Sequence, residues 1–142
     1  MEDQEKIIKK IQTCLTWAAL FNVIGIFVAM IMAADNRVAI SYVFEGVVLF
    51  YILMQIHYCC QKLMTTPIFS RAITGYMRKV SYACFVSSIG SSIIQTIVGI
   101  MEQEKFTLTL DLTMIGIGLL IYVGAYIYEY GCQMKHEIDL TI

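Results

Sequence analysis

The sequence has little charge and almost no proline. Charged residues fill 15% of its 142 positions and there is one proline, while 58% of the residues are hydrophobic. A soluble domain of this length usually has about a quarter of its residues charged, so this much apolar sequence needs a non-aqueous environment. No internal repeat, low-complexity tract or Gly/Pro-rich linker divides the chain. We therefore expect one membrane-embedded domain over residues 1–142.

Two further absences restrict the function. The net charge is -1, and no basic patch is large enough to neutralise a run of phosphates, which argues against nucleic acid as a direct partner. The sequence also lacks the GxSxG, HExxH, phosphate-loop and CxxC motifs, and its two histidines have no obvious nucleophile to serve. We expect a protein that is not an enzyme and uses no cofactor.

What the sequence does contain is four apolar stretches of about 20 residues, the length that crosses the hydrocarbon core of a bilayer. They must be helical, because lipid offers no partners to the backbone groups of an open strand. The prediction is an all-α membrane protein, a four-transmembrane-helix bundle, with spans at residues 14–34, 40–60, 80–101 and 108–130. Small residues at four-residue spacing predict close packing between the helices: Gly25, Ala29 and Ala33; Ala83, Ser87 and Ser91; Gly116 and Gly124.

The positive charges predict the orientation. Cytoplasmic segments of membrane proteins carry an excess of Lys and Arg. The N-terminal arm, the middle loop and the tail contain Lys6, Lys9, Lys10, Lys62, Arg71, Arg78, Lys79 and Lys135, whereas the other two loops contain only Arg37 and Lys105. Both termini are therefore expected in the cytoplasm. The five cysteines then lie in the cytoplasmic halves of their helices, where free thiols are expected.

The segment between the second and third spans reads as a cytoplasmic amphipathic helix. Thr66 and Pro67 are typical of a helix start. A basic face beside an apolar stripe suits a helix lying on the inner leaflet, and a docking face for a protein is the alternative. The residues proposed for this surface are Ile68, Phe69, Arg71, Ile73, Arg78 and Lys79.

Polar residues within the spans are functional candidates, because ionisable groups are costly in lipid. Glu45, Gln95 and Asp111 are expected at similar depth, where they could form a hydrogen-bonded cluster. Glu45 could carry protons, or the cluster could be a structural clamp. His57 lies close to Cys59 and Cys60, but adjacent cysteines on a helix point in different directions, so we do not expect a metal site.

The C-terminal tail alternates polar and apolar residues, which is the strand pattern. A lone strand has no neighbour in a helical bundle, so two interpretations stay open. The tail is either a short peptide that adds to a partner's sheet or fits a groove, or a frayed end whose alternation is chance. The candidate partner-binding residues are Glu137, Ile138, Asp139, Leu140, Thr141 and Ile142.

Two segments carry a family resemblance: Pro67-Ile68-Phe69-Ser70, and the ending from Gly131 to Ile142. Both resemble the small bacterial four-helix membrane proteins of domain of unknown function family 2975, although those usually have Phe directly after Pro, where this chain has Ile68. The resemblance implies residence in the bacterial plasma membrane and no known activity. Members are commonly encoded beside a Cro-type helix-turn-helix regulator, which implies a cytosolic transcription regulator as partner and favours docking through the tail.

Three functions therefore compete. The first is a sensor or anchor in the bilayer for a cytosolic regulator. The second is a small proton-coupled transporter or exporter that uses Glu45, and the third is immunity against a membrane-active peptide. Self-association into a homo-oligomer is compatible with all three. We favour the first, because polar sequence is concentrated on the expected cytoplasmic side.

Overall fold

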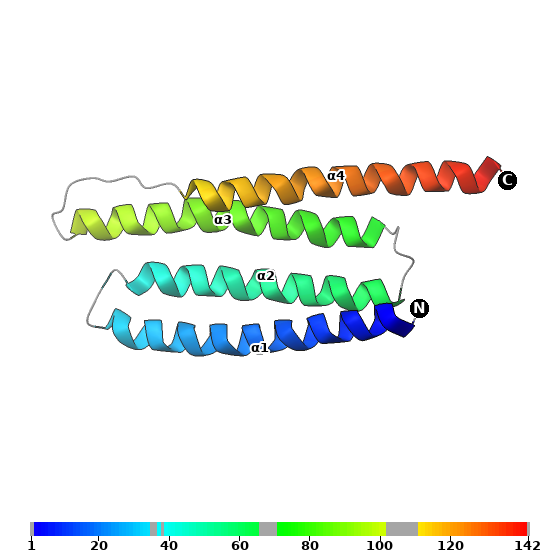
Figure 1. The fold of residues 1–142 in the computed structure, drawn as a ribbon. Helices are drawn as coiled ribbons and strands as arrows, with labels where there is room; N and C mark the ends of the chain where they lie inside the picture. The colour runs from blue at the N-terminus through cyan, green and yellow to red at the C-terminus, as the bar shows by residue number, and fades with distance from the viewer. Residues whose placement is uncertain (1, 35–36, 38, 66–70, 102–110, 142) are drawn as a thin grey trace.

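The protein consists of four long helices (Figure 1). The computed structural model describes residues 2–34, 37, 39–65, 71–101 and 111–141. Within them the chain has no strand, which confirms the predicted all-α fold. The helices are α1 (Glu2–Ala33), α2 (Ala39–Thr65), α3 (Arg71–Met101) and α4 (Leu112–Thr141). All four are long and apolar enough to cross a membrane.

The helices lie antiparallel to their sequence neighbours, in the order α1, α2, α3, α4 (Figure 1). In the described residues α1 packs only on α2, and α4 packs only on α3, so the row does not close into a ring. The first turns of α1 and α3 and the last turns of α2 and α4 lie at one end, here called the termini end. The last turns of α1 and α3 and the first turn of α2 lie at the other, here called the hairpin end.

The distribution of side chains is the reverse of that in a water-soluble protein. The bulkiest fully buried side chains of the described residues are serines, Ser41, Ser81 and Ser88. Large apolar side chains such as Phe21 and Leu120 are instead more than two-thirds exposed. Water would drive these side chains inside, whereas in lipid, helices associate through small and hydroxyl-bearing residues. The surface of this protein therefore fits hydrocarbon.

Helix α3 is the most buried of the four, and its buried face is rich in hydroxyl groups. The predicted ridge of Ala83, Ser87 and Ser91 is buried, as expected. The predicted ridges of α1 and α4 do not mark close helix contacts at Gly25 and Gly116, because a Cβ atom at either position would have no neighbour within 4 Å. Close helix approach occurs elsewhere.

The closest approaches involve three glycines that the spacing pattern did not single out. A Cβ atom at Gly118 of α4 would lie 3.3 Å from the Ser81 carbonyl oxygen of α3. One at Gly90 would overlap the Phe44 ring, and one at Gly46 would lie 2.6 Å from Cγ1 of Ile26. Gly118 therefore lies at the α3–α4 contact, Gly90 at the α2–α3 contact and Gly46 at the α1–α2 contact.

The basic stretch before the third span is helical, as predicted, but it is not a separate helix. Residues 71–79 form the first turns of α3 and continue into the span without a break. Arg71 and Lys79 are exposed, whereas Ile73 is 4% exposed and faces protein rather than the membrane surface. Ile68 and Phe69 lie outside the described residues.

The strand pattern of the tail was misleading, because α4 continues as a helix to Thr141. A strand without a neighbour leaves its N–H and C=O groups unpaired, whereas a helix pairs them internally. Extending an existing helix also avoids the cost of a new nucleus. The side chains of Asp139, Leu140 and Thr141, and the whole of Ile142, lie outside the described part of the chain.

Candidate functional site

A polar cavity lies between α2, α3 and the start of α4. Its volume is about 280 Å³. Carboxyl and hydroxyl groups from three helices meet there, although the cavity also has an apolar wall. Its lining residues are Tyr42, Glu45, Gly46, Leu49, Ile52, Ser87, Ser91, Asp111 and Met114.

Asp111 reaches the cavity from the N-cap of α4. Its Oδ1 atom accepts hydrogen bonds from the backbone N–H groups of Thr113 (3.0 Å) and Met114 (3.2 Å). This is the usual role of Asp at a helix start. The hydroxyl of Ser88 donates to the Asp111 carbonyl oxygen at 3.0 Å and ties the cap to α3. The predicted fourth span began at residue 108, but the helix begins after Asp111.

Asp111 is exposed but lies part-way along α3. Because Ser88 lies opposite Asp111, α3 continues past the start of α4 as far as Met101 (Figure 1). The N-cap carboxyl is thus set back from the hairpin end of α3. It shares the cavity with Glu45, which lies in the second turn of α2.

Glu45 and Asp111 are two of the three residues expected to cluster. The two carboxyls are close enough to interact electrostatically, and Ser91 lies within hydrogen-bonding reach of Glu45. Gln95 is exposed and does not line the cavity. The prediction matched depth along the helix but ignored rotation. Eight residues after Ser87, Gln95 lies about 80° further around α3 and about 12 Å further along it.

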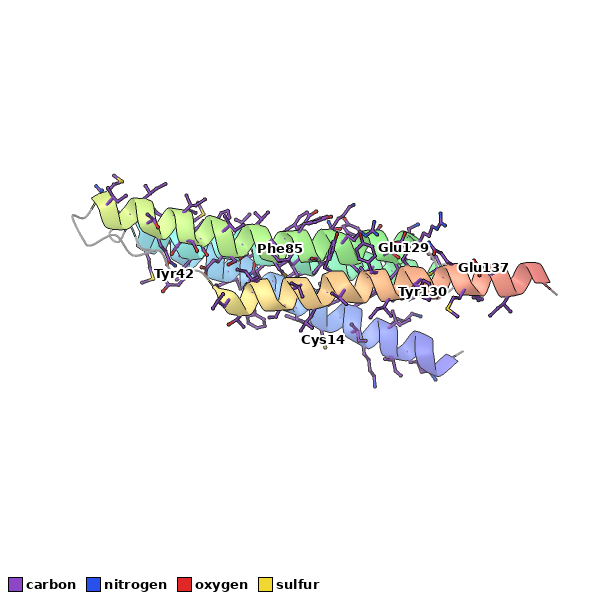
Figure 2. All side chains as sticks on the ribbon, turned by 90° about the horizontal axis from the view of Figure 1, so that it is seen from above. Cys14, Tyr42, Phe85, Glu129, Tyr130 and Glu137 are labelled. Carbon is purple, nitrogen blue, oxygen red and sulfur yellow. The ribbon has the colours of Figure 1, made fainter. Side chains whose placement is uncertain are left out.

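The two serines of the cavity were predicted as packing residues and not as site residues. Ser87 and Ser91 are each 6% exposed, and they share one face of α3. Tyr42 lies near the hairpin end and lines the cavity (Figure 2). A serine pair four residues apart, opposite a carboxylate, is the sequence signal that could have found this site.

A second polar cluster joins α3 to α4 nearer the termini end. Nη2 of Arg78 lies 2.5 Å from Oε2 of Glu129, and the guanidinium lies over the Tyr126 ring, 5.0 Å from its centre. Arg78 was expected on the membrane surface, but it pairs within the protein. Further along the same contact, Ser81 donates to the Gly118 carbonyl oxygen at 2.8 Å.

His57 lies on the other side of the protein, in an open groove between α1 and α2. The groove is lined by six residues of α1 in addition to His57. Cys59 and Cys60 are free thiols that lie outside this lining. In the described residues, no three His, Cys, Asp or Glu side chains come together as a metal ion would require.

The C-terminal part of α4 projects beyond the other helices at the termini end (Figure 1). Glu137 lies on this projection, well past the first turn of α3 (Figure 2). Three exposed apolar side chains lie at four-residue spacing in the C-terminal part of α4, from beside the start of α3 onto the projection: Tyr130 (65%), Met134 (48%) and Ile138 (56%). Because residues four apart share one face of a helix, the projection carries an apolar stripe.

The family described as "Protein of unknown function (DUF2975)" matches residues 37–142, about three quarters of the chain. The chain belongs to the DUF2975 family. The matched region of this DUF2975 member contains the whole cavity and the helical projection, and begins just before α2. The resemblance found in the sequence is thereby confirmed. No curated protein and no solved structure matched the chain.

Proposed function

We propose that this DUF2975 member is a non-enzymatic protein of the bacterial plasma membrane that anchors a cytosolic regulator. The C-terminal projection of α4 is the docking segment in this proposal. The observation that carries it is that α4 continues as a helix beyond the first turn of its antiparallel neighbour α3.

The charge distribution supports a cytoplasmic position for the termini end. This end brings together the basic first turns of α1 and α3 and the last turns of α2 and α4. Only Arg37 and Lys105 belong to the connections at the hairpin end. The positive-inside rule then assigns the termini end to the cytoplasm.

The length of α4 supports a segment outside the bilayer. Its 30 residues span about 45 Å as a helix. The hydrocarbon core is only about 30 Å thick. Because α4 starts beside the middle of α3, the excess length is at its C-terminal end. About three turns are available to a partner in the cytosol.

The helical conformation changes the expected mode of docking. An exposed stripe at four-residue spacing suits a groove that receives one face of a helix, whereas the alternation in the sequence suggested an added strand. Tyr130, Met134 and Ile138 are the anchors in this arrangement. The partner that the family resemblance implies is a Cro-type helix-turn-helix regulator.

The test is affinity capture from native membranes after crosslinking. Full-length protein should retain a cytosolic regulator that is absent with a chain ending at His136. Met134→Asn should reduce capture severalfold, because it removes an anchor of the helical stripe. Gln133→Asn, one residue away on another face, is the matched control and should capture normally.

Two outcomes separate the alternatives. If Met134→Asn captures normally but the truncated chain does not, the tail binds in another conformation. If the truncated chain captures the same regulator as the full-length protein, the docking role of the projection is wrong.

A further inference from the structure

We propose that the cavity between α2, α3 and α4 binds a small organic ammonium group, that is, a protonated or quaternary amine. This inference is independent of the docking role of the tail. It concerns residues at the other end of the membrane-spanning region, and it can hold whether or not a regulator binds.

Charge points to a cation. Glu45 and Asp111 both line the cavity, and none of its described lining residues is basic. Two carboxylates that line one cavity repel, and acidic groups within a membrane span are normally paired or coordinated. The N-cap hydrogen bonds use Oδ1 of Asp111 and leave its second oxygen outside the cap. A cation between the two carboxyls would offset the repulsion.

A hydroxyl group independently points to a ligand. Ser87 is 6% exposed and lines the cavity, yet its hydroxyl has no hydrogen bond to any described residue. Its neighbours on α3 behave differently, since Ser88 and Ser92 donate to backbone carbonyl oxygens. Buried hydroxyls are nearly always paired. The Ser87 hydroxyl is therefore available to a molecule in the cavity.

Size and wall chemistry favour an organic cation over a metal ion. A volume of about 280 Å³ is close to the lower end of small-molecule pockets. Two carboxyls are too few for a dehydrated metal site, while Leu49, Ile52 and Met114 supply an apolar wall. The Tyr42 ring adds a surface on which ammonium groups bind through cation–π attraction.

The ammonium group has two natural sources. One is a free amine that enters from the aqueous side, and the other is the ethanolamine headgroup of a neighbouring lipid. The cavity is partly open to its surroundings, which admits either. The chemistry that recognises the group is the same in both cases.

The experiment measures equilibrium binding of benzyltrimethylammonium to the purified full-length protein in phosphatidylglycerol nanodiscs, with empty nanodiscs as the blank. We expect saturable binding with one site per chain. Phenylmethanesulfonate, an anion of similar shape, should not bind.

Adding phosphatidylethanolamine to the nanodiscs identifies the source of the ammonium group. Competition with the probe assigns the site to a lipid headgroup, and unchanged affinity assigns it to a free amine.

Variants connect the binding to the cavity. Glu45→Gln should weaken binding by about tenfold or more, because it removes a charge that the cation faces. Ser87→Leu should abolish binding, because the larger side chain fills the cavity while both carboxyls remain. Ser92→Ala, a buried serine of the same helix outside the cavity, is the matched control and should bind normally. Thermal melting of each variant verifies that it is folded.

The proposal is overturned if the wild-type protein shows no saturable binding of the probe. It is also overturned if folded Glu45→Gln and Ser87→Leu bind as tightly as the wild type, because the cation would then sit elsewhere.

Discussion

The guanidinium of Arg78 in α3 lies 2.5 Å from the carboxylate of Glu129 in α4, although 51 residues separate them in the chain. Both side chains are about one-third exposed, so the pair lies between the lipid-facing surface and the helix contact. Together with the Ser81–Gly118 and Ser88–Asp111 hydrogen bonds, it fixes the register of α3 against α4.

Reversing one charge of this pair should destabilise the protein. Arg78→Glu places two carboxylates side by side, and Glu129→Arg two guanidinium groups, so each should cost about 1–3 kcal/mol. The double exchange should recover much of that loss. Thermal melting in detergent measures all three. Equal destabilisation by the double exchange and by the sum of the single changes would mean that the pair does not couple the two helices.

Enlarging Gly118 should disrupt the α3–α4 contact. Gly118→Leu drives its side chain into α3, where a Cβ atom at this position would already lie 3.3 Å from the Ser81 carbonyl oxygen and 3.1 Å from the Cys84 Cβ atom. Overpacking of this kind costs about 1–3 kcal/mol or more. Gly116→Leu, two residues earlier, meets open space and should melt at or above the wild-type temperature. Similar melting of the two variants would contradict the observed packing.

Substitutions of Asp111 should separate stability from ligand binding. Asp111→Ala removes the N-cap of α4 and should cost about 1 kcal/mol, whereas Asp111→Asn keeps a side-chain oxygen for the cap. The Asn variant should therefore melt near the wild type but bind benzyltrimethylammonium more weakly. Melting curves and equilibrium binding on the same samples test this. Normal binding by the Asn variant would exclude the Asp111 charge from the site.

The orientation can be tested by cysteine labelling. In a variant with its five native cysteines replaced by serine or alanine, Arg37→Cys should react with a membrane-impermeant maleimide in intact cells. Glu137→Cys should react only after lysis, because the termini end is assigned to the cytoplasm. The opposite labelling pattern would invert the topology and remove the tail from the cytosol.

The sequence predicted well what depends on local composition. Apolar runs of membrane-spanning length predicted all four helices. The predicted C-terminal ends of the first and third spans, residues 34 and 101, lie within one residue of the ends of α1 and α3. The start predicted at residue 40 is also within one residue of the start of α2, and the other ends differ by four to twelve residues. Most of these differences arise because helices continue into polar sequence when nothing breaks them. Residues 71–79 and the tail contain no proline, so both continue the adjacent helix.

The candidate site was predicted in part. The depths of Glu45 and Asp111 along their spans were sufficient to bring them together. Ser87 lines the cavity and Gln95 does not. This difference could not be predicted, because the rotation of α3 about its axis depends on its contacts with two other helices. The partner of Arg78 was missed for the same reason.

The amino-acid sequence by itself therefore determined that this chain forms long apolar helices and which end of them carries the positive charge. Both follow from hydrocarbon thickness and from the cost of unpaired backbone groups in lipid. Only the tertiary structure decided which faces of the helices meet. In lipid, apolar residues are equally stable on every face of a helix. Small residues and a few hydrogen bonds therefore select the faces through which the helices pack. Those contacts placed Ser87 beside the two carboxyls and left the end of α4 projecting alone.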